Sequence, residues 1–183
     1  MHRIVSDESL DTLFRTACSH QAWLDRPVSE TLLRALWELV KLGPTSDKSS
    51  PARILFIRSD KAKERLAPTL PPNERAVAQA APVTAIIASE LGSAVGAGLA
   101  DAEARPRALA VRDGALRGAY LILAARALGL DCRPIWDFHA DAIESAFLSK
   151  GTATFLCALG YGDDAQREPD RPRTGFDAAS QIL

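Results

Sequence analysis

The pattern of apolar and polar residues predicts an amphipathic helix that ends near Gly43. Ser29 stands at the N-cap position of this helix, and Glu30 favours the positive end of the helix dipole. Gly43 and Pro44 are residue types that end helices. The apolar residues recur at helical spacing and form one face of the helix: Leu32, Leu33, Leu36, Leu39 and Val40.

Five further helices are predicted from periodicity and capping residues. Ser6 or Ser9 caps a first helix that should end near His20, and Ser59 caps a short helix further on. Asn73 is the expected cap of the next helix, and Gly129 takes the left-handed position after the longest one. These helices should cover residues 6–20, 59–66, 73–81, 106–128 and 139–148.

Short apolar segments rich in β-branched residues predict three buried strands, at residues 54–57, 83–88 and 154–159. Residues 132–138 are expected to form an irregular connector around Pro134. Helices that alternate with strands indicate an α/β or α+β layered domain. A chain of 183 residues, 47% of them hydrophobic, suits one domain that spans residues 1–183.

The longest helix is apolar or small over much of its circumference. Leu116, Tyr120 and Leu123 can line one stripe, but Ala119 and Ile122 extend the apolar surface beyond it. Such a helix is expected to be buried on several sides. It could form the centre of the domain or a subunit interface, and both alternatives stay open.

Composition and charge exclude several function classes. The 22 basic and 23 acidic side chains nearly cancel, so nothing favours a nucleic-acid or membrane partner, and a small molecule or a protein is expected instead. Three cysteines without CxxC spacing argue against a disulfide framework. No apolar run approaches the roughly 20 residues of a membrane helix, and no signal pattern is present, so a cytoplasmic location is expected.

The candidate nucleophiles and metal ligands are weak. The histidines His2, His20 and His139 form no H-x-x-x-H pair, so no metal site is expected. Cys18 and His20 are expected to lie on a helix, where near neighbours point in different directions, so no Cys or Ser hydrolase is predicted. No phosphate-loop, kinase or nucleophile-elbow motif occurs in the chain.

Two segments are candidate ligand sites. Residues 43–53 form a loop rich in hydroxyls between a helix and a strand, which suits a ligand platform, although a simple connection is the alternative. Arg171 and Arg173 flank a proline in extended chain, so their side chains share a direction and could bind an anion as planar forks. Alternatively, they are two solvated charges on a tail.

Several sequence runs carry a resemblance to a known family. They are SHQAW at 19–23, the loop at 43–53, GAYLILAARALGLDC at 118–132 and LCALGYGD at 156–163. The chain resembles the nitroreductase family from about Leu10 to Leu183, and most closely the malonic semialdehyde reductase branch. The resemblance implies an α+β, three-layer fold with a central, mostly antiparallel sheet flanked by helices. It also implies a homodimer with the long helix at the interface and the C-terminal arm exchanged between subunits.

The resemblance further implies FMN as cofactor and NAD(P)H as reductant for a small carbonyl or nitro compound. Ser19, Gln21, Arg171 and Arg173 would hold the phosphate and ribityl chain, and Lys48 would contact the pyrimidine edge. No catalytic side chain is implied. The full set of implied cofactor-binding residues is Ser19, His20, Gln21, Pro44, Thr45, Ser46, Lys48, Pro134, Ile135, Trp136, Asp137, Arg171 and Arg173.

The chain departs from the family pattern at several of these segments. Cys18 stands where an arginine is expected, and Lys48 stands where the family has an asparagine. Arg133, Trp136 and Asp137 replace residues of the family run GPMSGF, two of them glycines. Two hypotheses therefore remain: an FMN-dependent oxidoreductase, or a homologue without FMN that binds, regulates or catalyses another reaction.

Overall fold

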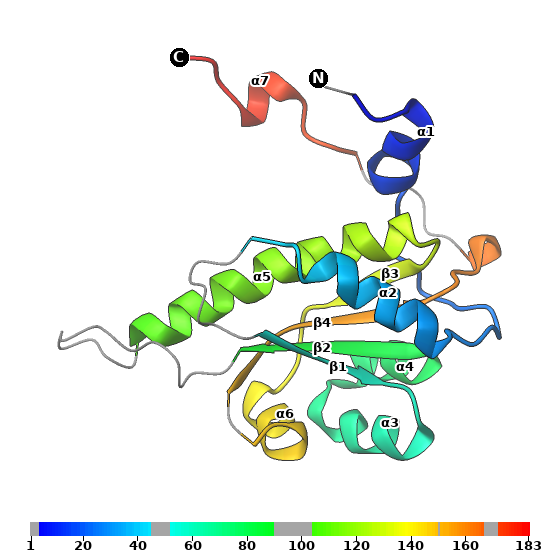
Figure 1. Cartoon of the computed structure of the whole chain (residues 1–183), viewed down its shortest axis with the longest axis vertical. Coiled ribbons are helices and arrows are strands. Elements are labelled where there is room, and N and C mark those ends of the chain that lie inside the picture. The colour runs from blue at the N-terminus through cyan, green and yellow to red at the C-terminus, as the bar shows by residue number, and fades with distance from the viewer. Residues whose placement is uncertain (1–3, 45–51, 90–103, 150, 167–171) are drawn as a thin grey trace.

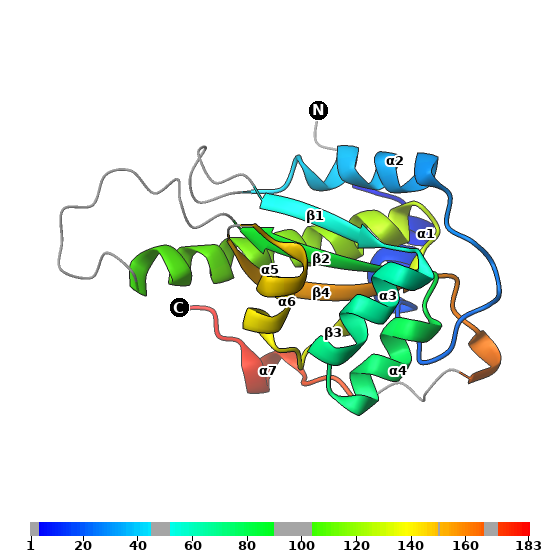
Figure 2. The same cartoon turned by 90° about the horizontal axis from the view of Figure 1, so that it is seen from below.

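The structure, a computed structural model, describes residues 4–44, 52–89, 104–149, 151–166 and 172–183. Its centre is an antiparallel sheet in the order β1-β2-β4-β3. The strands are β1 (Ala52–Ile57), β2 (Val83–Ser89), β3 (Asp131–Ile135) and β4 (Thr152–Gly160). Helices α2 and α5 cover one face, and α3, α4 and α6 cover the other (Figures 1 and 2). The predicted three-layer α+β arrangement with an antiparallel sheet is confirmed.

The position of each strand explains its sequence. Strand β2 lies between two neighbours and all seven of its residues are buried, so it is apolar almost throughout. The three predicted strands are present and are longer than expected. The prediction of an irregular connector at 132–138 was wrong, because Asp131–Ile135 pairs with β4. Pro134 is tolerated there because β3 lies at the edge of the sheet, where a missing N–H costs no ladder bond.

Helix α2 (Glu30–Val40) follows its predicted caps. The Ser29 hydroxyl accepts a hydrogen bond from the Leu32 N–H at 3.2 Å, which satisfies one of the exposed donors of the first turn. Leu33, Leu36 and Val40 are buried, but Leu39 is exposed, so the buried stripe is narrower than predicted. The face of α2 that is buried packs on the sheet together with α5.

Helix α5 (Ala104–Ala127) approaches β4 closely because two of its residues lack a side chain. A Cβ at Gly114 would lie 2.0 Å from Thr154 Oγ1, and one at Gly118 would lie 2.7 Å from the Phe155 ring. Gly129 follows the helix with a φ of +75°, as predicted. On the side of α5 away from β4, Leu116 and Tyr120 are exposed in the single chain. Burial of this side would need a second subunit, and the subunit-interface alternative stays a prediction.

The second face of the sheet is covered by three shorter helices and a 3-10 turn. They are α3 (Asp60–Leu66), η2 (Ala67–Thr69), α4 (Pro72–Ala80) and α6 (Ala140–Phe147). Ser59 caps α3 as predicted, with its hydroxyl 3.3 Å from the Ala62 N–H. The Asn73 cap was wrong, because α4 begins at Pro72, a residue suited to the first helical position. Ile57, Leu66, Ile86, Ile143 and Leu156 form the centre of this second core.

The two ends of the chain stand apart from the sheet (Figure 1). Helix α1 (Asp7–Leu10) is capped by Ser6 and continues as the π-helical turn η1 (Asp11–Arg15). The prediction that this helix ends near His20 was therefore wrong. The chain after β4 holds the short turn η3 (Asp164–Gln166), and helix α7 (Phe176–Ala179) lies in an arm, 172–183, that is exposed throughout. No helix in the described part of the chain is long and apolar enough to cross a membrane.

The packing of α5 predicts that Gly118→Ala lowers the free energy of unfolding by about 1–3 kcal/mol, because the new methyl group forces α5 away from Phe155. Gly175→Ala is the matched control, since an added Cβ there meets nothing within 4 Å. Urea denaturation of both variants measures the difference. Equal unfolding midpoints for the two variants would contradict the proposed close contact.

Candidate functional site

The segment 19–24 crosses the ends of two strands and is held there by backbone pairing. Ser19 forms a parallel bridge with Cys132 of β3, and Trp23 forms an antiparallel bridge with Gly162, just after β4. The Leu24 N–H donates to the Tyr161 carbonyl at 2.8 Å. Two of the sequence runs that carried the family resemblance therefore contact each other in space.

Two glycines make room for aromatic rings of this segment: Gly160, the last residue of β4, and Gly162, just after the strand. A Cβ at Gly160 would lie 2.8 Å from Trp23 Cε3, and one at Gly162 would lie 2.1 Å from His20 Cδ2. Any side chain at Gly162 would therefore overlap the imidazole. The glycines of the run LCALGYGD are needed because the rings of the first run pack directly on them.

The imidazole of His20 points into the protein and is only 5% exposed. Its Nε2 lies 3.3 Å from Asp164 Oδ1, and its Nδ1 lies 3.7 Å from Asp131 Oδ1. Asp131 Oδ2 also accepts a hydrogen bond of 2.8 Å from the Gly162 N–H. The neighbours Ser19 and Gln21 are both exposed, so the chain presents them to solvent while it buries His20.

Cys18 lies beside the same ring. Its Sγ is 3.8 Å from Nδ1 and 3.7 Å from Nε2 of His20, so the prediction that these side chains do not face one another was wrong. The helix ends at Arg15, and Cys18 and His20 flank a residue that pairs with β3, which places them on one side. Because Sγ is nearly equidistant from both nitrogens, it lies along the lone-pair direction of neither. A long contact shared between both nitrogens differs from the short, directed nucleophile–base hydrogen bond of a cysteine hydrolase.

Arg133 joins three elements of the site. Its guanidinium donates to Gln21 Oε1, and its second terminal nitrogen lies 3.8 Å from Glu74 Oε2 of α4. Both members of the Arg133–Glu74 pair are largely buried, and Glu74 Oε2 accepts no hydrogen bond within the described part of the chain. Sequence reasoning treated Arg133 only as a departure from the family pattern. It missed the contact because Glu74 lies on a helix far away in the chain.

The segment from Pro134 to Asp137, which spans the end of β3, contains one core residue among more exposed ones. Ile135 is buried against the second core, so only its backbone can face a ligand, whereas Pro134 is partly exposed. Trp136 is 75% exposed and meets Phe155 edge-on at a centroid distance of 6.3 Å, and Asp137 is exposed. The indole therefore lies on the surface of this chain and does not fill its interior.

The remaining predicted site residues are only partly covered by the structure. Pro44 is exposed after the C-terminal end of α2, and Arg173 lies in the exposed C-terminal arm. Thr45, Ser46, Lys48 and Arg171 lie outside the described residues. The structure thus brings Ser19 and Gln21 to Cys132 and Arg133, which directly precede the segment from Pro134 to Asp137, with His20 turned inward.

The thiols next to this site are inert core groups. Cys132 and Cys157 are fully buried on neighbouring strands. A hydrogen bond between the Cys157 thiol and the Cys132 side chain, together with burial, raises the pKa of the Cys157 thiol well above its ordinary value. A buried thiol that stays protonated is a poor nucleophile and a poor metal ligand. Within the described ranges, no group of three or more His, Cys, Asp or Glu side chains could hold a metal ion.

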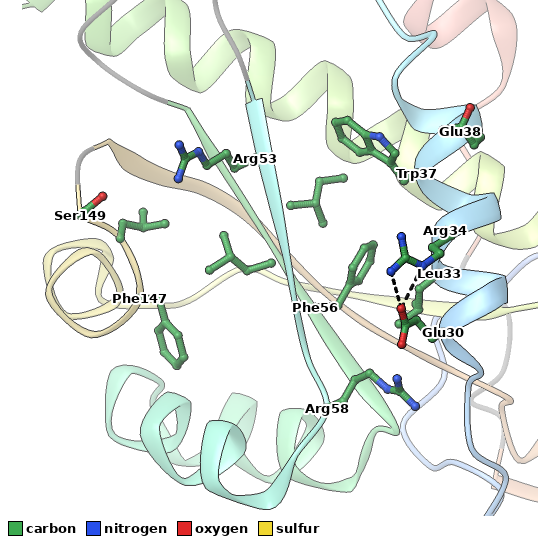
Figure 3. Close-up of a pocket in the computed structure, with 13 residues that line it drawn as sticks. Glu30, Leu33, Arg34, Trp37, Glu38, Arg53, Phe56, Arg58, Phe147 and Ser149 are labelled. Carbon is green, nitrogen blue, oxygen red and sulfur yellow. Dashed lines mark hydrogen bonds and ion pairs between the residues drawn. The ribbon is translucent and has the colours of Figure 1, made fainter.

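A second feature, which sequence reasoning missed, is a groove of about 920 Å³ along the outer edge of β1. Figure 3 shows β1 between Trp37 and Arg34 of α2 on one side and Phe147 and Ser149 on the other. We call it the β1-edge groove. Its floor and walls are largely apolar, and charged side chains lie along its rim: Glu30, Arg34, Glu38, Arg53 and Arg58.

Comparison with known proteins identifies the family. No family model matches the chain. A protein of Ralstonia nicotianae with the name "Putative NADH dehydrogenase/NAD(P)H nitroreductase" is 41% identical, and the alignment covers 95% of this chain and 96% of the relative. The chain belongs to the nitroreductase family.

Solved structures agree with this membership at the level of the fold. Two of them bear the description "putative nitroreductase". One, from Bacillus subtilis, has a TM-score of 0.82 at 16% identity and covers 97% of this chain and 100% of its own. The other, from Exiguobacterium sibiricum and in complex with FMN, has a TM-score of 0.79 at 20% identity and covers all of both chains. The predicted nitroreductase fold is confirmed.

The buried Arg133–Glu74 pair generates a prediction about stability. Arg133→Met should lower the free energy of unfolding by about 2–4 kcal/mol, because it leaves the Glu74 carboxylate buried without its cation. Adding Glu74→Gln should restore most of the loss. Arg34→Met, which breaks an exposed pair with Glu30, is the control and should leave the urea midpoint nearly unchanged. A double variant as unstable as Arg133→Met alone would contradict the pairing.

Proposed function

We propose that this protein is an FMN-dependent NAD(P)H oxidoreductase that reduces a small carbonyl or nitro compound, in the manner of a malonic semialdehyde reductase. The names of its relatives support NAD(P)H-linked reduction, and one fold neighbour was solved with FMN. The observation that carries the proposal is the pairing of Ser19 with Cys132. It holds two exposed polar side chains, Ser19 and Gln21, against the part of β3 that leads into the segment from Pro134 to Asp137.

The chemistry of the described residues fits the polar end of FMN. Ser19 offers a hydroxyl, Gln21 offers an amide, and the Arg133 guanidinium lies against Gln21. Arginine binds phosphate through a planar fork, so Arg133 can provide a cation beside Gln21. Trp136 is too exposed to close the interior of this chain against a ligand.

The positions of these residues suggest a separate role for each group in the proposed FMN site. When bound, FMN would accept a hydride from NAD(P)H and deliver it to the substrate. Ser19, Gln21, Arg171 and Arg173 would hold the phosphate and ribityl chain, and the loop with Pro44, Thr45, Ser46 and Lys48 would face the pyrimidine edge. The backbone from Pro134 to Asp137, rather than its side chains, would line the ring. No side chain is assigned as a proton donor or acceptor.

The proposal includes a homodimer with the C-terminal arm exchanged between subunits. Leu116 and Tyr120, which lie on the side of α5 away from β4, are apolar and exposed, which is costly in water unless a partner covers them. The arm also exposes Ile182 and Leu183, and the backbone at Ser180 is extended. The β1-edge groove is the acceptor we propose for the partner's arm, because an open strand edge can pair with added extended chain (Figure 3).

Flavin binding is the first test. The purified protein should show flavin absorbance or bind added FMN saturably, one per chain, and the loaded protein should oxidise NADPH or NADH with a nitroaromatic compound or malonic semialdehyde as acceptor. Ser19→Ala should weaken FMN binding about tenfold through the lost hydrogen bond to a charged group. A colourless protein without saturable FMN binding would favour the alternative of a homologue without flavin.

Oligomeric state tests the arm. A chain that ends at Arg173 should lose its dimer in size-exclusion chromatography with light scattering, whereas the full chain should elute as a dimer. Ile182→Asp should weaken the dimer in the same way, because the charge would have to enter an apolar groove. Ile4→Asp, at another fully exposed apolar position, is the matched control. A full chain that elutes as a monomer would contradict the dimer.

A further inference from the structure

The buried orientation of His20 sets it apart from the other residues of its run. Ser19 and Gln21 are exposed, while the imidazole between them is 5% exposed and packs on the chain after β4. We infer that His20 is a positioning residue of the FMN site: its ring, seated on Gly162, holds Ser19 and Gln21 in place without touching the ligand. This inference rests on the proposed function, since it names what the buried residue does for that site.

The His20 ring occupies a closely fitting site in the protein. The three atoms nearest to a Cβ added at Gly162 all belong to the His20 ring, at 2.1, 2.2 and 2.4 Å. Groups from three segments surround the imidazole: the thiol of Cys18, the carboxylates of Asp131 and Asp164, and the indole of Trp23 at a centroid distance of 6.5 Å. The ring is therefore held by a close backbone contact on one side and by two carboxylates at its nitrogens.

Burial of the His20 ring fixes the positions of its two exposed neighbours, Ser19 and Gln21. The backbone at Ser19 is tied to β3 by a single bridge, and the next backbone hydrogen bonds along the chain join Ala22 and Leu24 to Asp163 and Tyr161. Between them, the Gln21 side chain accepts from Arg133. The His20 side chain is the other anchor between these backbone ties. Without the ring, the peptide groups on either side of residue 20 lose their fixed direction, and the side chains of Ser19 and Gln21 turn with them.

A mutant cycle tests this role. The proteins compared are the wild type, His20→Ala, Gly162→Ala and the double variant, with the exposed His139→Ala as a control. Dissociation constants for FMN and for riboflavin, which lacks the phosphate, are measured by quenching of flavin fluorescence. Hydrogen–deuterium exchange of the backbone amides of residues 19–21 provides a second readout that does not depend on the flavin.

Each single variant should weaken FMN binding about tenfold or more and riboflavin binding clearly less. The reason is that the displaced side chains, Ser19 and Gln21, are those proposed to bind the phosphate end. The double variant should bind FMN as His20→Ala does, since the clash at Gly162 disappears when the ring is gone. His20→Gln, which keeps an N–H that can reach Asp164, should recover part of the affinity. Amides 19–21 should exchange faster in both single variants, and His139→Ala should match the wild type.

Two results would overturn the inference. One is an equal loss for FMN and riboflavin, which indicates general destabilisation; the other is unchanged exchange at residues 19–21 in His20→Ala. If the wild type binds neither flavin, the proposed function fails, but the exchange data still decide whether the ring fixes this segment. The two failures are therefore distinguishable.

Discussion

The close approach of α5 to the sheet is the constraint on which the rest of the fold depends. Gly114 and Gly118 lie one helical turn apart, and both face β4, where Thr154 and Phe155 occupy the space that side chains would need. With the helix this close, Leu121 and Ala125 are completely buried against the sheet together with the inner face of α2. The same packing leaves the other side of α5 apolar and exposed, so one feature both builds the core and creates a surface for a second subunit.

The candidate site is built on the ends of the strands that this packing fixes. Strand β3 and the chain after β4 form a platform, and the segment 19–24 crosses it by backbone pairing at two points. Two aromatic rings, those of His20 and Trp23, pack on glycines, and two polar side chains, Ser19 and Gln21, are left on the outside. Arg133 then links Gln21 to the opposite layer of the fold through Glu74. The polar side chains Ser19 and Gln21 thus stand on an irregular segment that backbone pairing fixes to the sheet.

The elements that the sequence predicts well are those set by local interactions. Ser29 and Ser59 cap their helices because a hydroxyl bonds an N–H three residues later, and Gly129 ends α5 because it adopts a left-handed backbone. Strand β3 was missed because Pro134 is allowed only by its place at the sheet edge, which depends on strand order. The inward turn of His20 was missed for a similar reason. Its seat at Gly162 is a contact between distant parts of the chain, and nothing near residue 20 encodes it.

The chain departs from the family pattern at Cys18, Arg133, Trp136 and Asp137, and the structure shows whether the two largest of these side chains block the proposed FMN site. Trp136 lies on the surface, and Arg133 brings a guanidinium to the side of Gln21, so neither closes the site. A crystal structure of the protein grown with FMN would test the account most directly. The account predicts the FMN phosphate within hydrogen-bonding distance of Ser19 and Gln21, with the His20 ring still buried against Gly162. Crystals without flavin, a flavin bound elsewhere, or a His20 ring turned out onto the phosphate would contradict it.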